Sequence, residues 1–323
     1  MLQAGTNFFK ALTLSLSKVV FAIFESMILD LKDLKPADRQ HYLQHVIAPR
    51  PICFASTIDS TGNVNLSPFS FFNLFSTTPP IAIFSPSRRM RDNSTKHTLQ
   101  NVLEVPEVVI SILDREMVQQ ASLSSCEYPK GINEFIKAGF TAEPATLVRP
   151  PMVKESKAKM ECKVSEIKPL GNEGGSGNLV ICEVVRMHLA DSILDENGRV
   201  DQRKLHHVAR LGGNWYCGVD ESNLFTVEKP NTELGIGVDA LPWSVRNSKI
   251  LSGNNLGQLA NVRQFPAIDP SFHDDHLDHI MQYYASDPDE MEVELHSYAR
   301  QLLKQGKVGE AWQILLAGNN DGI

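Results

Sequence analysis

Short apolar runs separated by turn residues fill the first two-thirds of the chain and predict β-strands. Residues 52–58 are apolar and β-branched, and residues 59–63 have the composition of a tight turn. Residues 64–67 are therefore expected to pair back as the second strand of a hairpin. Residues 81–85 and 108–113 are continuous apolar runs, which are typical of buried strands.

Three further strands are predicted in the next hundred residues. Residues 159–167 and 179–188 form two of them, and residues 211–216 lead into the last. The Gly-rich segment 169–177 joins the first two. Because no Gly-Lys-Ser/Thr follows it and strands flank it on both sides, the segment is interpreted as a hairpin loop rather than a phosphate-binding loop.

Short helices are predicted between these strands. Helical spacing of apolar residues occurs at 34–45, 95–103, 116–124 and 133–138. A doubly wound parallel sheet would need long, regular strand–helix alternation, which this pattern lacks. The predicted fold is mainly β, a β-barrel carrying helical insertions.

The pattern changes after Pro230, so the chain is divided there. Residues 229–268 are rich in Gly and Asn and are expected to form an extended arm, whereas residues 269–323 have helical periodicity and predict a small α-helical appendage. The appendage carries three apolar stripes, and we hypothesise that they pack across a partner subunit. The barrel domain is placed at residues 27–228.

The first 26 residues are set apart from this domain. Residues 11–24 are apolar but contain Lys18, and the run is too short to span a bilayer. No small-residue cleavage site follows, so a signal peptide is a weak interpretation. Residues 1–26 are interpreted as a leader, poorly ordered or misassigned, with a helix packed on the domain as the alternative.

Composition narrows the class of protein. The chain has 323 residues and a formal net charge of -7, with no long basic run, which argues against nucleic-acid binding. Its five Cys residues are widely spread and include no Cys-x-x-Cys, which favours reduced, structural thiols and a cytoplasmic location. No membrane partner is predicted.

A metal site is considered between His273 and His279 and set aside. His276 and His279 are three residues apart and could share a helix face. Asp274 and Asp275, however, stand where a helix is expected to begin, and acidic residues are favoured there by the helix dipole. No metal ligand is assigned.

Candidate ligand-binding chemistry is concentrated in residues 46–101. Hydroxyl and amide side chains follow the predicted strand ends, with cationic side chains near them, which suits a flat, partly apolar ligand carrying a phosphate. Phe69, Phe71, Phe72 and Phe75 are interpreted as core and dimer-interface residues rather than a stacking platform. The candidate cofactor-binding residues are Ser56, Thr57, Asn65, Ser67, Ser70, Ser87, Arg88, Lys96, Thr98 and Asn101.

The same window resembles the flavin reductase-like family, whose fold is the FMN-binding split β-barrel. The resemblance covers residues 28–227. It is carried by Ala48-Pro49-Arg50-Pro51-Ile52, Ser56-Thr57, Gly62-x-x-Asn65-Leu66-Ser67-Pro68-Phe69-Ser70, Pro79-Pro80, Lys96-x-Thr98-x-x-Asn101, Asn133-Glu134-Phe135, Gly139-Phe140 and Arg210-Leu211-Gly212-Gly213.

This resemblance implies a homodimer with FMN near the subunit interface. It also implies an oxidoreductase in which the flavin passes hydride or electrons from NADH or NADPH to a small-molecule acceptor. Because the flavin carries the redox chemistry, no residue is assigned as catalytic.

One departure keeps a second function open. Short-chain flavin reductases of this family carry Gly-Asp-His near the hairpin loop, whereas this chain has Gly175-Ser176-Gly177. The departure favours the flavoredoxin-like branch of the family. The alternative function is therefore a non-catalytic flavin-binding electron carrier that docks a redox partner protein. A pyridoxamine-phosphate oxidase type of split barrel fits the motifs less well.

Overall fold

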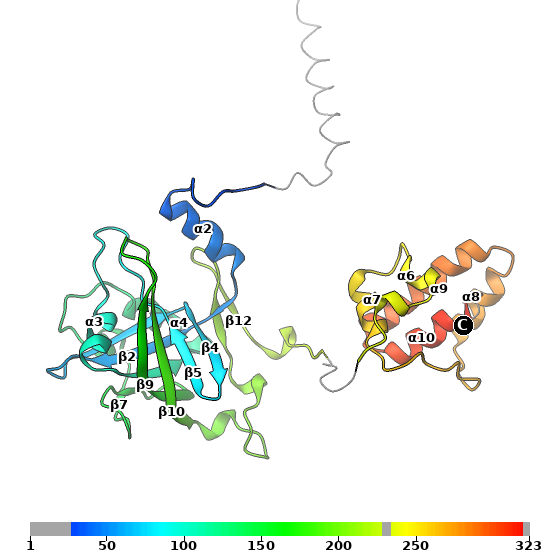
Figure 1. The fold of residues 1–323 in the computed structure, drawn as a ribbon. Helices are drawn as coiled ribbons and strands as arrows, with labels where there is room; N and C mark the ends of the chain where they lie inside the picture. The colour runs from blue at the N-terminus through cyan, green and yellow to red at the C-terminus, as the bar shows by residue number, and fades with distance from the viewer. Residues whose placement is uncertain (1–26, 228–233, 319–323) are drawn as a thin grey trace, which may run out of the picture. The chain divides into compact units, whose positions relative to one another are not determined.

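The computed structural model describes residues 27–227 and 234–318 (Figure 1), so the predicted leader 1–26 lies outside the described residues. The chain divides into two compact units between Leu224 and Phe225. Each unit is described by itself.

Unit 1 is built on one antiparallel sheet with strand order β3-β2-β6-β9-β10-β5-β4. The first and last strands of this order, β3 and β4, are joined only by Ser70 and Phe71. Because opposite edges of the sheet are tied so closely, the sheet must curl into a barrel, which stays open because β3 and β4 do not pair with each other. The strands are β2 (Cys53–Ile58), β3 (Val64–Phe69), β4 (Phe72–Thr77), β5 (Pro80–Phe84), β6 (Glu107–Ile112), β9 (Ala158–Pro169) and β10 (Asn178–Leu189).

The strand predictions agree with this sheet except at one place. The expected first hairpin is formed, with Thr57 opposite Asn65, and the Asp59 carboxylate accepts a hydrogen bond from the Asn63 N–H at 2.9 Å to close its turn. Strand β4 was not predicted. Residues 211–216 were expected to lead into the last strand, and they connect β11 (Val208–Arg210) to β12 (Tyr216–Gly218). These two strands pair beside β1 (Arg50–Pro51).

Helices cover parts of the barrel and correspond to the four predicted ones. Strand β2 is buried on both sides, because Cys53 and Ala55 face one apolar cluster while Ile52 and Phe54 face another, with Phe135 of α5. The helices are α2 (Pro36–Val46), α3 (His97–Glu104), α4 (Val118–Ser124) and α5 (Glu134–Ala138). Short pieces are η1 (Arg115–Met117), η2 (Asp191–Ile193), η3 (Gln202–Lys204) and η4 (Glu221–Asn223), with the paired strands β7 (Ala142–Glu143) and β8 (Met152–Val153).

Unit 2 is helical and has its own apolar core. Leu259, Ile280, Leu303 and Trp312 are each almost completely buried there. The Trp312 indole also donates a hydrogen bond to the Leu259 carbonyl at 3.2 Å. Its elements are η5 (Val238–Ala240), α6 (Trp243–Arg246), α7 (Gly253–Ala260), α8 (Asp275–Tyr283), α9 (Pro288–Lys304) and α10 (Val308–Ala317).

One expectation for this region differs from the structure. The range 229–268, expected as an extended arm, contains α6 and α7 in its described part, and Leu259 of α7 belongs to the core of the unit. Ser252 and Asn255 start α7 as a capping box, a local signal that the Gly and Asn content obscured. Most residues of the apolar stripes pack inside the unit, although Met281 is 36% exposed. The stripes are thus largely covered within the unit, and packing across a partner subunit stays a prediction.

None of the helices in residues 27–227 and 234–318 combines the length and apolar character needed to cross a membrane.

Candidate functional site

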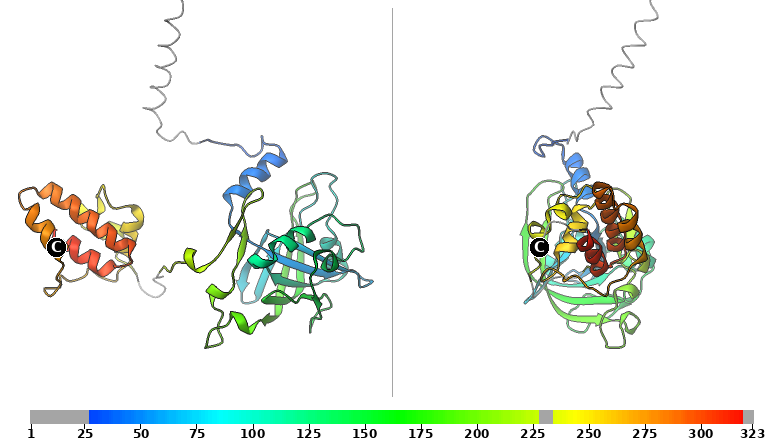
Figure 2. Two further views of the ribbon diagram at one scale, coloured as in Figure 1. Left: turned by 180° about the vertical axis from the view of Figure 1, so that it is seen from behind. Right: turned by 90° about the vertical axis from the view of Figure 1, so that its right-hand side faces the viewer.

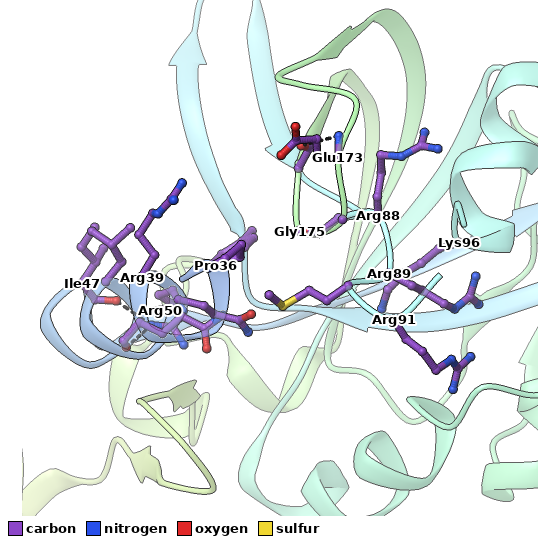
Figure 3. Close-up of a pocket in the computed structure, with 18 of the residues that line it drawn as sticks. Pro36, Arg39, Ile47, Arg50, Arg88, Arg89, Arg91, Lys96, Glu173 and Gly175 are labelled. Atoms are coloured by element: carbon purple, nitrogen blue, oxygen red, sulfur yellow. Dashed lines mark hydrogen bonds between the residues drawn. The ribbon is translucent and has the colours of Figure 1, made fainter. Parts of the chain in front are cut away.

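A cavity of about 790 Å³ opens in unit 1 between three segments that are distant in sequence (Figure 3). The first is helix α2. The second is the loop after β5, from Ser87 to Arg91, together with Lys96 at the start of α3. The third is the tip of the β9–β10 hairpin, from Glu173 to Ser176.

The loop after β5 is held in shape by two of its own arginines. The Arg88 guanidinium donates to the side-chain and main-chain oxygens of Asn93, both at 2.7 Å. Asn93 has φ 58°, a left-handed conformation that Asn tolerates better than most residues. Arg89 donates to the Thr95 carbonyl at 2.7 Å, directly before Lys96. The arginines therefore fix the path of the chain into α3.

The hairpin tip lies on this loop through main-chain contacts. The Arg88 N–H donates to the Ser176 carbonyl at 2.9 Å, and the Gly175 N–H donates to the Arg88 carbonyl at 3.0 Å. At Gly174 a Cβ would come within 3.0 Å of Met90 Cα and 3.1 Å of the Arg89 oxygen. Close approach of the two backbones therefore requires glycine at this position.

The cavity is strongly cationic. Six of its lining side chains are Arg or Lys and only two, Glu127 and Glu173, are acidic. Glu127 pairs with Arg89 at 3.1 Å and with Arg91 at 2.9 Å, which offsets part of the charge. Burial and the neighbouring Arg89 lower the pKa of Lys96, with Glu127 acting in the opposite direction.

Lys96 is the cation best placed to receive an anion. Its ammonium lies 5.4 Å from the centre of the Phe69 ring. Within residues 27–227 and 234–318 it has no hydrogen-bond or ion-pair partner. A half-buried ammonium without a hydrogen-bond or ion-pair partner is unfavourable. Binding of a negatively charged group beside it therefore lowers the free energy of the site.

Three of the ten predicted binding residues line the cavity, namely Ser87, Arg88 and Lys96. Four others pair with one another instead. The Asn65 amide donates to the Thr98 hydroxyl at 2.9 Å, and the Asn101 amide donates to the Thr57 hydroxyl at 3.1 Å. These bonds tie α3 to β2 and β3, and thereby set the position of Lys96, which directly precedes α3.

The remaining three predicted residues lie on β2, β3 and the connection to β4, outside the cavity lining. Ser56 is completely buried and its hydroxyl has no hydrogen-bond partner among the described residues. Ser67 is half-buried and contacts the Asn65 amide at 3.5 Å, and Ser70 is half-buried beside Phe71. Of the four phenylalanines, Phe69 is buried in the core, Phe72 packs against it, and Phe71 lines the cavity.

The sequence-based prediction missed one whole wall of the cavity and its hairpin cover. Arg39, Gln40 and Leu43 of α2 line the cavity, although the helix was predicted without any ligand-binding residue. Their spacing places them on one helix face, a signal visible in the sequence. Nothing in the sequence indicated that Glu173 to Ser176 would reach the loop after β5.

The His- and Asp-rich segment of unit 2 forms a helix start. Asp274 accepts hydrogen bonds from the His276 and Leu277 N–H groups at 3.0 and 2.8 Å, as an N-cap residue does. In the described parts of the chain, no three His, Cys, Asp or Glu side chains are grouped so that they could hold a metal ion.

Comparison with known proteins identifies relatives of unit 1. Residues 46–208 match the model of the flavin reductase like domain. An uncharacterized protein of Aquifex aeolicus is 37% identical over 171 residues, which are 53% of this chain and 85% of that protein. An uncharacterized protein of Halalkalibacterium halodurans is 33% identical over 206 residues, 63% of this chain and 97% of that protein.

Solved structures agree on the fold. Nitrilotriacetate monooxygenase component B from Bacillus cereus superposes with a TM-score of 0.59 at 27% identity, covering 63% of this chain and all of that one. A split-barrel protein of Shewanella frigidimarina that is assigned as a flavin reductase gives 0.54 at 25% identity, with 63% and 100% covered. More than a third of this chain therefore has no counterpart in either structure.

Proposed function

Since the chain belongs to the flavin reductase-like family, with its split β-barrel fold, we propose that the cavity of unit 1 binds FMN through Lys96 and Arg88. In this proposal the protein passes hydride or electrons from a reduced nicotinamide through the flavin to a small-molecule acceptor. The observation that carries it is the unpartnered Lys96 ammonium in a cavity lined by six cationic and two acidic side chains.

The lining fits a flavin mononucleotide. The volume of about 790 Å³ lies in the range of small-molecule sites. A phosphate dianion suits Lys96 and Arg88, while Phe71 and Met90 offer apolar surface for a ring system. Bound flavin would supply the redox chemistry, and the protein side chains would bind and orient it. No side chain is proposed as an acid or base.

The homodimer belongs to the same proposal. Strand β4 is an edge strand, and its Leu74 and Phe75 side chains are 59% and 65% exposed. An apolar edge strand of this kind is normally covered. A second copy covering it would bring its own residues toward Ser67 near the end of β3 and Ser70 in the β3–β4 connection. A cytoplasmic location is proposed from the dispersed free cysteines.

The second candidate function is a flavin-binding electron carrier that docks a redox partner protein. It is favoured by the hairpin tip, where Glu173, Gly174, Gly175 and Ser176 line the cavity and no histidine is present. In the carrier, the flavin would exchange electrons with a protein rather than with a nicotinamide.

Absorption spectroscopy separates these functions. Purified full-length protein is titrated with FMN, and the complex is then mixed with NADH or NADPH without oxygen, with free FMN as the control. The reductase predicts saturable FMN binding and bleaching by at least one donor, faster than for free FMN. Binding without accelerated bleaching supports the carrier. Absence of FMN binding would overturn both.

Gly174→Val tests the contact between the hairpin tip and the loop after β5. The added side chain would press on the backbone of Met90 and Arg89, so the tip must move away. Loss of that cover is expected to weaken FMN binding about tenfold, or roughly 1.4 kcal/mol. Titration by flavin fluorescence measures the effect. Gly257→Ala is the control because nothing lies within 4 Å of its Cβ position, and an unchanged affinity in Gly174→Val would contradict the assignment.

A further inference from the structure

Helix α2 presents one face to the cavity and contributes no buried residue to the core. Two rows at helical spacing form this face, Pro36–Gln40–Gln44 and Arg39–Leu43–Ile47. The face thus combines one cation and two amides with an apolar strip. Because this helix packs no side chain into the core but forms a wall of the cavity, we interpret its role as ligand binding.

The orientation of this face is fixed from its C-terminal end. The Arg50 guanidinium donates to the Gln44 and Ile47 carbonyls, both at 2.6 Å, and to the Leu211 carbonyl at 2.9 Å. A Cβ at Gly212 would overlap the His45 ring, so the turn of the β11–β12 hairpin lies directly against the helix. Figure 2 shows α2 beside this hairpin in unit 1. These contacts therefore hold the α2 face in its orientation without a bound ligand.

The cations of the cavity lie in two groups on opposite sides (Figure 3). Arg88, Arg89, Arg91 and Lys96 form one group, next to the loop after β5. Arg39 of α2 and Arg50 form the other, and the Arg50 guanidinium is engaged by three carbonyls. Arg39 is therefore the cation of this group that is open to a ligand. Its guanidinium donates one hydrogen bond, to the Leu34 carbonyl at 2.8 Å, while its buried Nε has no partner among the described residues.

Two separate cationic groups can bind two separate anions. FMN carries a single phosphate, which the proposed function places at Lys96 and Arg88, so the cations on the α2 side are left for a second anion. The proposed hydride donor is a dinucleotide, and its pyrophosphate supplies the second anion. Gln40 and Gln44 can hydrogen-bond ribose hydroxyls, and Leu43 offers an apolar surface to a base.

We propose that the α2 face is the binding site for the pyrophosphate and adenosine part of the nicotinamide dinucleotide, with Arg39 as the pyrophosphate contact. This inference rests on the proposed function. Hydride transfer oxidises the dihydronicotinamide to its cation and reduces the flavin by two electrons, and no bond of the pyrophosphate changes. Arg39 therefore acts in binding, so its loss should raise KM and leave kcat nearly unchanged.

The test compares Arg39→Gln with Lys35→Gln in the full-length protein. Lys35 is exposed, precedes the same helix and does not line the cavity, so its variant controls for the change in charge. Three quantities are measured: the Kd of FMN by fluorescence, the KM for NADH and NADPH, and the Kd of ADP by calorimetry. ADP carries the adenosine and the pyrophosphate without the nicotinamide. Rates are also measured with 1-benzyl-1,4-dihydronicotinamide, a donor that has no phosphate.

We expect Arg39→Gln to raise KM and the Kd of ADP about tenfold, the effect of losing one charge-assisted hydrogen bond. The FMN affinity and the rate with the phosphate-free donor should stay within twofold, and Lys35→Gln should match the unmodified protein. An equal loss of FMN affinity, or unchanged KM and ADP binding, would overturn the inference. If the unmodified protein binds no FMN, the proposed function fails, while ADP titration still tests the α2 site.

Discussion

Lys96→Met is expected to weaken FMN binding by about 10- to 100-fold, because it removes the unpartnered ammonium from the cavity. Hydrogen bonds to charged groups contribute about 1.5–3 kcal/mol, which corresponds to this range. The fold should be unaffected, since Lys96 precedes α3 without a side-chain cap hydrogen bond. In the unliganded protein the substitution removes a half-buried charge that has no hydrogen-bond partner and that contacts the Phe69 ring.

Riboflavin makes this prediction specific to the phosphate. It has the ring and ribityl chain of FMN without the phosphate, so its affinity should be nearly equal in Lys96→Met and the unmodified protein. Both ligands are titrated by flavin fluorescence. Lys163→Met is the matched control, because Lys163 is exposed on β9 and does not line the cavity. An equal loss of riboflavin and FMN affinity would show that Lys96 does not bind the phosphate.

The pH dependence gives a second measure of the same contact. Burial and Arg89 lower the pKa of Lys96 in the free protein. The ammonium is therefore lost at a lower pH than for an ordinary lysine, and FMN affinity should fall as the pH rises through that lowered pKa. Lys96→Met should lack this alkaline decline. A decline of equal size in both proteins would assign it to another group.

The parts of the fold that the sequence predicts well are those decided by neighbours in the chain. The β2–β3 hairpin is one, because the turn closed by Asp59 and the apolar strand before it are both local signals. Ser87, Arg88 and Lys96, which line the cavity, were predicted for a similar reason. They follow a buried strand, where a loop with cationic side chains is a common place for a phosphate.

The rest depends on contacts between distant segments. Thr57 and Asn101 are 44 residues apart, and the sequence shows two polar side chains without showing that they satisfy each other. The cavity wall at Arg39 and the hairpin tip at Gly174 are likewise joined to Lys96 only by the tertiary fold. In unit 2, the prediction of an extended arm at residues 229–268 relied on the Gly and Asn content and did not use the capping box that starts α7.

Glu161→Met is expected to lower the free energy of unfolding of unit 1 by about 3–5 kcal/mol, the range for removing one partner of a buried charged network. The Glu161 carboxylate is completely buried on β9. It accepts hydrogen bonds from the Thr146, Leu147 and Val148 N–H groups at 3.1, 2.5 and 3.1 Å, and lies 2.6 Å from His188 Nε2. Methionine would leave these donors without an acceptor.

Glu161→Gln separates the charge from the hydrogen bonds. A glutamine oxygen can still accept from the Leu147 and Val148 N–H groups, while its nitrogen can face the Thr146 hydroxyl and His188. Glu161→Gln should therefore lower the free energy of unfolding by clearly less than Glu161→Met does. Hydrogen exchange of β9 and β10 peptides along a urea series measures both in the full chain. Glu183→Met on β10 is the control, because Glu183 is exposed.

The destabilisation by Glu161→Met should shrink as the solution becomes acidic. Burial raises the pKa of Glu161, but the hydrogen bonds from Thr146 and His188 outweigh it and lower the pKa to about 2. In the unfolded chain the pKa is about 4.3. The stabilisation by the carboxylate is therefore complete above that value and is lost as the pH falls toward 2. The two proteins should converge in stability over this interval. A difference that stayed constant from pH 6 to pH 2 would mean that packing, not the carboxylate, holds residues 146–148 against β9.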